Sequence, residues 1–219
     1  MCGFYGIVSK KFNFSKKNLK EITSSIKHRG PDMHGSINEV IDNKYIYFDH
    51  NRLSILDLSN NGTQPYVSED KNFIMVFNGE IYNFKEIKKV LENKNITFNS
   101  NTDTEVLFKS WIYWGDKCLE KLIGMFSFAI LDRRTKKISL IRDNFGMKPL
   151  YFYKDSDNFY FSSEIICILK IHNKKFEVNL DRTFDYLIKG NCDDTDETFF
   201  KNIYQLRPGE ILSLDINKN

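Results

Sequence analysis

Cysteine and histidine are scarce in this 219-residue chain, which has four of each, and neither type is clustered. No two cysteines form a CxxC pair, so their spacing fits neither a zinc site nor a dense disulfide framework. This cysteine usage favours a reducing compartment, and we expect a cytoplasmic protein with no metal site. The cysteines are Cys2, Cys118, Cys167 and Cys192. We expect the last three to be structural thiols.

Long hydrophobic runs, targeting segments and an excess of one charge are absent as well. No apolar run approaches the roughly 18 residues of a membrane span. No basic region precedes an apolar stretch at the N-terminus, as a signal peptide requires. The 32 basic and 29 acidic residues are mixed along the chain, which argues against a nucleic-acid surface. We therefore expect neither a membrane nor a nucleic-acid partner.

Three common functional motifs are also missing. The chain has no GxxxxGK[ST] phosphate loop, no GxGxxG after a strand and no GxSxG nucleophile elbow. Each of these motifs has a defined mechanical role in phosphate binding or in serine catalysis. The sequence therefore gives no support to those classes of site.

The chain does contain clear signals for strands and helices. Residues 3–8 read as a short buried strand, and Ser15 is the expected N-cap of a helix that Gly30 ends. Two strand-like runs between residues 40 and 56 flank a turn at 42–43. The first part of the chain therefore mixes both kinds of element.

Two further helices begin with the pattern of a capping box. Asn83 precedes one helix and has Glu86 three residues on, and Thr102 has Glu105 at the same distance. In a capping box the two side chains satisfy each other's backbone N–H groups. The second of these helices is expected to end at Gly115.

From residue 125 the pattern changes to strands. We expect hairpins at 125–143, 150–163 and 202–215, the last around a type II turn at Pro208 and Gly209. Helices are expected at 162–170 and 179–190. Helices concentrated in one half and hairpins in the other favour a layered α+β fold over an alternating βαβ fold.

A thiol stands at position 2, in the opening stretch MCGFYG. A thiol attacks as the thiolate, and its ordinary pKa near 8.5 means that it needs a base. Removal of Met1 would give Cys2 a free α-amine, whose ordinary pKa of about 7.7–8.0 suits a general base. Nucleophile and base would then share one residue. Considered alone, a cysteine at position 2 is more often an incidental residue of a frayed terminus.

Four other positions give Cys2 a chemical context. The side-chain amide of Asn78 and the N–H of Gly79 could hold the oxyanion of an acyl-transfer intermediate. Arg52 could bind a carboxylate with its planar fork, and Asp103 could accept a hydrogen bond from an ammonium group. Singly, they also fit a turn, a strand arginine and a helix N-terminal acid. Together they predict a site that binds the two ends of glutamine and attacks its side-chain carbonyl.

Several longer stretches resemble one family. The sequence resembles the glutaminase domain of class II glutamine amidotransferases, in its asparagine synthetase branch. The matching stretches occur in order: MCGFYGIV, KHRGPD, NRLSILDLS followed by QP, FNGEIYNF, DTEVL, GMFSFAILD, RDNFGMKPLY and FSSEI. They span residues 1 to about 164. The later stretch TFFKNIYQLRPGE resembles the segment that closes this domain.

The resemblance implies a fold and a set of site residues. The fold is α+β, a four-layer αββα sandwich of the N-terminal nucleophile hydrolase type, over residues 2–215. The implied nucleophile is Cys2, with its own α-amine as base, and the implied oxyanion hole is Asn78 with Gly79. The implied glutamine-binding residues are Arg52, Leu53, Ile55, Asn78, Gly79, Glu80 and Asp103. Asn144 departs from the family, which often has arginine there, but it lies outside these contacts.

The resemblance also implies a reaction and a partner. Family members continue into an ATP-dependent synthetase domain with an SGGxDS-type loop, and these 219 residues contain no such loop. We therefore expect the glutaminase domain to need no cofactor, and ATP and Mg²⁺ to serve only the absent domain. The expected reaction converts L-glutamine to L-glutamate and ammonia, which a synthetase domain or subunit uses to make asparagine from aspartate. We expect an exposed apolar patch for that partner.

Two alternatives stay open on the residues alone. The same glutaminase could supply ammonia for amidation of a sugar or another carboxylate. The domain could also be a non-catalytic regulatory or interaction module that retains the fold, and a retained Met1 would favour this interpretation. The residues do not decide whether the chain is a fragment or a separate subunit, or whether it forms a homodimer.

Overall fold

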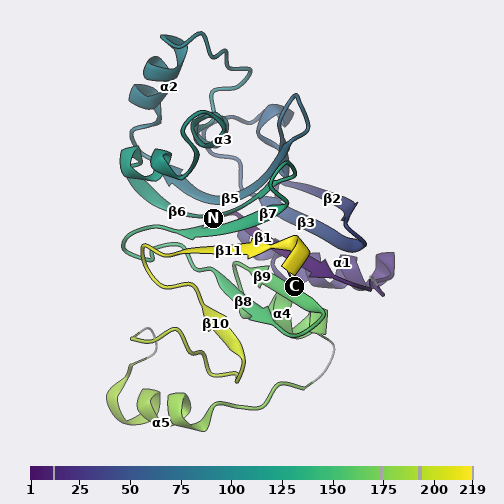
Figure 1. The fold of residues 1–219 in the computed structure, drawn as a ribbon. Coiled ribbons are helices and arrows are strands. Elements are labelled where there is room, and N and C mark those ends of the chain that lie inside the picture. The colour runs from purple at the N-terminus through teal and green to yellow at the C-terminus, as the bar shows by residue number, and fades with distance from the viewer. Residues whose placement is uncertain (12, 173–174, 192–193, 219) are drawn as a thin grey trace.

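Two antiparallel β-sheets lie face to face, with helices on their outer sides (Figure 1). The computed structural model describes residues 1–11, 13–172, 175–191 and 194–218. Cys192, which we expected to be a structural thiol, lies outside the described residues.

The first sheet has six strands in the order β10-β8-β9-β1-β3-β2. Its strands are β1 (Gly3–Ser9), β2 (Met33–Ile41), β3 (Lys44–Arg52), β8 (Tyr151–Lys154), β9 (Asn158–Ser162) and β10 (Ile203–Gln205). β1 is an interior strand, and its pairing with β3 begins at Gly3 opposite Asn51. Its other edge pairs with β9. The start of the chain is therefore fixed inside a sheet from its third residue.

The second sheet has five strands in the order β11-β7-β6-β5-β4. They are β4 (Tyr66–Val67), β5 (Phe73–Ile81), β6 (Gly124–Asp132), β7 (Lys137–Arg142) and β11 (Ile211–Asp215). β6 and β7 form the first predicted hairpin, and β8 and β9 of the other sheet form the second. The two-residue strand β4 pairs only with the early part of β5, at Met75 and Ile74. The later part of β5 is therefore free of a strand neighbour on that side.

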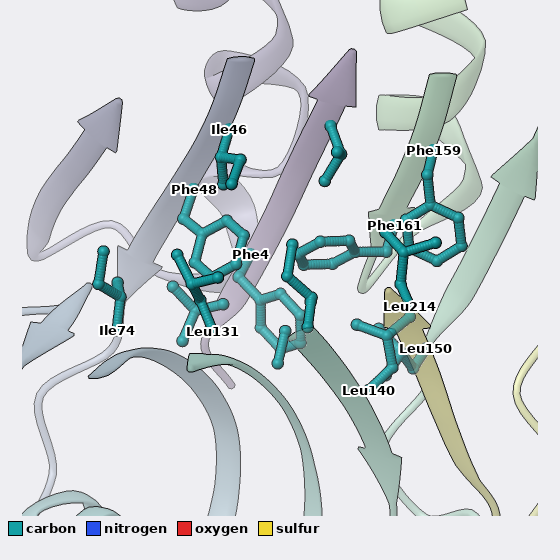
Figure 2. Packing of buried hydrophobic residues seen from close by; sticks show 14 of the residues in the cluster. Phe4, Ile46, Phe48, Ile74, Leu131, Leu140, Leu150, Phe159, Phe161 and Leu214 are labelled. Carbon is teal, nitrogen blue, oxygen red and sulfur yellow. The ribbon is translucent and has the colours of Figure 1, made fainter. Parts of the chain in front are cut away.

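Large apolar side chains fill the space between the two sheets. Phe48 and Phe161 from the first sheet lie against Leu131 and Leu140 from the second (Figure 2). The ring of Phe161 packs edge-on against Phe48, with ring centroids 5.3 Å apart. Gly6 leaves room for this ring, because a Cβ at that position would lie 2.0 Å from it. The packing between the sheets therefore depends on the absence of a side chain at Gly6, opposite the ring of Phe161.

Helices cover the outer face of each sheet. α2 (Phe84–Glu92) and α3 (Asp103–Trp114) pack on the second sheet, and α1 (Lys16–Ser25) and α4 (Ile165–His172) pack on the first. α5 (Leu180–Lys189) lies beyond β10, at the bottom of Figure 1. Short 3₁₀ helices occur at Lys27–Arg29, Asn60–Gly62, Gly115–Lys121 and Ile216–Lys218. The layer order confirms the predicted four-layer αββα sandwich.

Most of the predicted helix ends are confirmed. Ser15 caps α1, and Thr102 caps α3 by accepting a hydrogen bond from the N–H of Glu105 at 3.2 Å. α3 and α5 end at Gly115 and Gly190, whose φ angles of +63° and +73° favour glycine. Cys118 and Cys167 are buried free thiols, as expected.

The remaining capping-box predictions are wrong. The side chain of Asn83 does not cap α2. It donates to the carbonyl of Lys121 at 2.8 Å and accepts from the N–H of Ile123 at 2.9 Å. The carboxylate of Glu105 accepts from the N–H groups of residues 99 and 100 instead of reaching back to Thr102. In both cases a loop outside the helix supplies the better partner.

The predicted hairpin at 202–215 is also wrong. β10 pairs with β8 in the first sheet, whereas β11 pairs with β7 in the second. The turn itself is present, because the N–H of Glu210 donates to the carbonyl of Arg207 at 3.1 Å. Gly209 has the positive φ, +73°, that such a turn requires. The turn lets the chain cross between sheets, since the free edges of β8 and β7 lie in different layers.

Replacement of Phe161 by alanine should lower the free energy of unfolding by about 3–5 kcal/mol, because it leaves a cavity between the sheets. Phe145→Ala is the matched control: that side chain is 84% exposed, and its loss should change stability by less than about 0.5 kcal/mol. Urea unfolding followed by fluorescence measures both variants. Equal losses in the two would contradict the packing described.

Candidate active site

One cavity of about 230 Å³ brings together all the site residues that the sequence indicated. It lies where the start of β1, the ends of β3 and β5, and the first turn of α3 meet. The indicated residues that line it are Cys2, Arg52, Leu53, Ile55, Asn78, Gly79, Glu80 and Asp103. The lining also includes residues that the sequence did not single out, among them Gln64 and Lys148.

Cys2 is held in place by contacts with distant parts of the chain. Its Sγ accepts a hydrogen bond from the N–H of Leu53, at 3.4 Å. Its carbonyl accepts from Nε of Arg29 at 2.9 Å, and Arg29 forms an ion pair with Glu164 at 3.0 Å. Burial raises the pKa of the Cys2 thiol, against the smaller effect of the bond from Leu53. Within the empty cavity the thiol is therefore a weak acid that needs a base to react.

Asn78 has the most distinctive surroundings in the cavity. Its side chain is 1% exposed. Neither its amide nitrogen nor its amide oxygen has a hydrogen-bond partner among the described residues. Buried polar groups are nearly always paired, because an unpaired one costs about 1–3 kcal/mol. An unpartnered amide on the wall of a cavity is therefore suited to a polar ligand.

The free edge of β5 directs a backbone N–H into the same cavity. Gln64 binds the N–H of Phe77 at 2.6 Å and the carbonyl of Phe77 at 3.3 Å. The N–H of Ile81 donates to Asp103 at 2.9 Å. Since alternate residues of a strand point their N–H groups to the same edge, the N–H of Gly79 lies between these two. A Cβ at Gly79 would lie 2.3 Å from the carbonyl oxygen of Met125, so only glycine fits there.

Asp103 supplies a buried carboxylate. It lies in the first turn of α3 and is 6% exposed. Burial raises the pKa of Asp103 to about 6, and the neighbouring charge of Glu80 acts in the same direction, against the hydrogen bond from Ile81. A cation beside such a carboxyl group would stabilise its charged form.

Arg52 has two functions in the structure. Its guanidinium lines the cavity, and it also donates to the carbonyls of Asp57 and, at 2.7 Å, Ser59. Gly62 packs against it, because a Cβ there would lie 2.3 Å from Nη2. These bonds turn the chain away from the sheet, so β3 ends at Arg52. The expectation that the strand-like run continues to residue 56 is therefore wrong.

Within the ranges given above, no three histidine, cysteine, aspartate or glutamate side chains lie close enough together to hold a metal ion. No helix of the described part of the chain is long and apolar enough to cross a membrane. The residues that line the cavity carry a thiol, amides, a guanidinium, carboxylates and the side chain of Lys148.

Comparison with known proteins agrees with this geometry. A family model described as a glutamine amidotransferase domain matches residues 1–219. The chain belongs to this family. A putative glutamine-hydrolyzing asparagine synthetase of Methanocaldococcus jannaschii is 36% identical over 234 residues, covering 100% of the chain and 45% of that protein. Glutamine-hydrolyzing asparagine synthetase 1 of Bacillus subtilis is 36% identical over 186 residues, covering 83% of the chain and 28% of that protein.

The glutamine amidotransferase domain thus spans less than half the length of these curated relatives. A solved structure of glutamine phosphoribosylpyrophosphate amidotransferase from Bacillus subtilis superposes with a TM-score of 0.67 at 17% identity. The match covers 100% of the domain and 50% of that chain. At this identity the likeness shows the fold alone, the layered α+β sandwich of two sheets and their covering helices.

Proposed function

We propose that this domain hydrolyses L-glutamine to L-glutamate and ammonia. The observation that carries the proposal is the buried, unpartnered amide of Asn78 in the cavity that also holds the thiol of Cys2. Arg52 and Asp103 line the same cavity and carry the charges that complement the two ends of an amino acid. Family membership supports the same reaction.

The mechanism begins with removal of Met1. The α-amine of Cys2 then accepts the thiol proton while Sγ attacks the side-chain carbonyl of glutamine. The oxyanion accepts hydrogen bonds from the side-chain amide of Asn78 and the N–H of Gly79. The protonated amine gives its proton to the departing nitrogen, so ammonia leaves and a thioester remains. Water then cleaves the thioester, which releases glutamate and restores the thiol.

Substrate binding uses the two charged side chains of the cavity. The carboxylate of Asp103 accepts from the α-ammonium of glutamine, and the guanidinium of Arg52 binds its α-carboxylate. Leu53 and Ile55 flank the substrate, and Glu80 completes the polar wall. No metal or cofactor takes part in these steps.

The ammonia is proposed to pass to a synthetase partner. The relatives named asparagine synthetases are more than twice as long as the matched region. Three large apolar side chains that line the cavity are exposed and form its rim: Ile55, Leu56 and Tyr82 are 63%, 52% and 59% exposed. We propose that a domain or subunit using ATP and Mg²⁺ covers this rim and makes asparagine from aspartate in the cytoplasm. Another acceptor, such as a sugar or a different carboxylate, would leave the glutaminase chemistry unchanged.

Retention of Met1 would favour the non-catalytic alternative. Its side chain lines the cavity, and while it is attached Cys2 has no free α-amine. A protein that retained Met1 would therefore fit a non-catalytic module with the same fold. Homodimer formation and the domain limits 2–215 stay predictions.

Replacement of Cys2 by alanine should abolish glutamate release, because it removes the nucleophile. Intact mass of the active wild-type protein should show that Met1 is absent. Glutamate production is measured by a coupled dehydrogenase assay. Cys118→Ala, which alters a buried thiol outside the cavity, should retain activity. Full activity of the Cys2→Ala protein would contradict the proposal.

Replacement of Asn78 by alanine should lower kcat by about 10²–10³-fold, the usual loss when one oxyanion donor is removed. Asn72→Ala provides a control on an asparagine next to the other end of β5, outside the cavity. Steady-state kinetics with purified variants distinguish the two. An unchanged kcat in Asn78→Ala would exclude this side chain from the oxyanion hole.

Glutamine binding should weaken as the pH falls below about 6. The raised pKa of Asp103, about 6, means that its carboxyl group is charged above this pH and neutral below it. The neutral form cannot pair with the α-ammonium, so affinity should fall about tenfold per pH unit in the acid range. Calorimetry with the Cys2→Ala variant between pH 5 and 8 measures binding without turnover. A dissociation constant that is flat across this range would refute the assignment, and Asp103→Asn should remove the dependence.

A further inference from the structure

Lys148 is a buried lysine in the wall of the catalytic cavity. It is 4% exposed, which is rare for lysine. Its Nζ lies 3.1 Å from Sδ of Met1. No carboxylate of the described residues forms an ion pair with it within 4 Å, since the ion pairs found there all involve other cations. A buried ammonium without a close anion is costly, so its position calls for a functional explanation.

The loop that carries Lys148 is fixed by buried charges. The carboxylate of Asp143 accepts from the N–H groups of Phe145, Met147 and Lys148, at 3.1, 3.0 and 3.0 Å. The guanidinium of Arg142 donates to the carbonyl of Lys148 at 3.1 Å. The backbone of Lys148 is thus held from both sides, and its ammonium lies at the start of the chain, beside Met1.

Several charges face this ammonium. Glu80 and Asp143 attract it, Arg29 repels it, and a thiolate at Cys2 would attract it. Burial outweighs the attraction by these anions, and the pKa of Lys148 is lowered from its ordinary value. Cys2 itself also faces Arg52 and Asp103 across the cavity.

We propose that the ammonium of Lys148 keeps the α-amine of the mature Cys2 unprotonated at neutral pH, so that the amine can act as the base. This inference rests on the proposed glutaminase function. An ordinary α-amine is mostly protonated at pH 7 and cannot accept the thiol proton. A like charge nearby disfavours the protonated form. Removal of Met1 takes away the sulfur beside Nζ and leaves the amine of residue 2 as the new end of the chain.

The test is the pH profile of kcat at saturating glutamine for the mature wild type and the variants Lys148→Met and Lys148→Arg. kcat is used because it reports the substrate complex, in which Asp103 is already paired. The acid limb of this profile is the range over which kcat rises as the α-amine of Cys2 loses its proton. In Lys148→Met the acid limb should move to higher pH, so that kcat at pH 6.5 falls about tenfold and kcat at pH 9 stays within about twofold of the wild-type value. Lys148→Arg should retain the wild-type limb because it keeps the charge.

Matched variants separate this effect from a general loss of structure. Lys44→Met changes another buried lysine, 8% exposed and outside the cavity, and should leave the profile unchanged. Glu80→Gln removes an anion that faces Lys148 and should move the acid limb to lower pH, which tests the idea even if Lys148→Met fails to fold. The inference would be overturned if the acid limb of Lys148→Met matched that of the wild type, or if the acid limb of Glu80→Gln did not move. An inactive mature wild type would instead refute the glutaminase function.

Discussion

The pairing of β1 with β3 on one edge and β9 on the other is the constraint on which the site depends. Chain termini normally fray because few contacts hold them. Here the ladder begins at Gly3, so Cys2 leaves the sheet in a fixed direction. Arg29 donates to the carbonyl of Cys2, and a Cβ at Gly3 would lie 2.9 Å from Cδ of Arg29. The proposed nucleophile, Cys2, therefore has a defined position although it lies next to the chain terminus.

The second sheet contributes the edge of β5, where one backbone N–H faces the cavity. β4 is too short to cover the end of β5, so other groups satisfy the exposed backbone there. Gln64 binds Phe77, and Asp103 binds Ile81, which leaves the N–H of Gly79 between them facing the cavity. Both side-chain contacts are structural, yet they select which single N–H stays available to a ligand. Edge strands are usually a risk for aggregation, and in the proposed mechanism this edge binds the substrate.

Local sequence predicted the elements well, since caps, turns and alternation act over a few residues. Thr102 and Gly115 mark the ends of α3 because their partners lie within one helical turn. The pairing of β10 and β11 could not be predicted, because a turn at Gly209 fixes a reversal and not the sheet that each strand joins. Site residues such as Asn78 were found by residue type and family resemblance. Lys148 was missed because its place in the cavity wall brings together residues far apart in the chain, and nothing in its local sequence separates it from a surface lysine.

Several polar and charged groups that line the cavity lower the stability of the folded domain. The amide of Asn78 lacks partners, Asp103 is a carboxylate with a raised pKa, and Lys148 is a buried cation with no close anion. Each lowers the stability of the folded state, because its desolvation is offset only in part: Asp103 accepts a hydrogen bond from Ile81, whereas the amide of Asn78 has no partner among the described residues. A ligand that supplies an oxyanion and an ammonium would remove much of this cost, and it would do so most fully when negative charge develops beside Asn78. Polar groups fixed in advance without partners are what transition-state stabilisation requires. Under the proposed function, the features that weaken the fold are therefore the ones that give the site its chemistry.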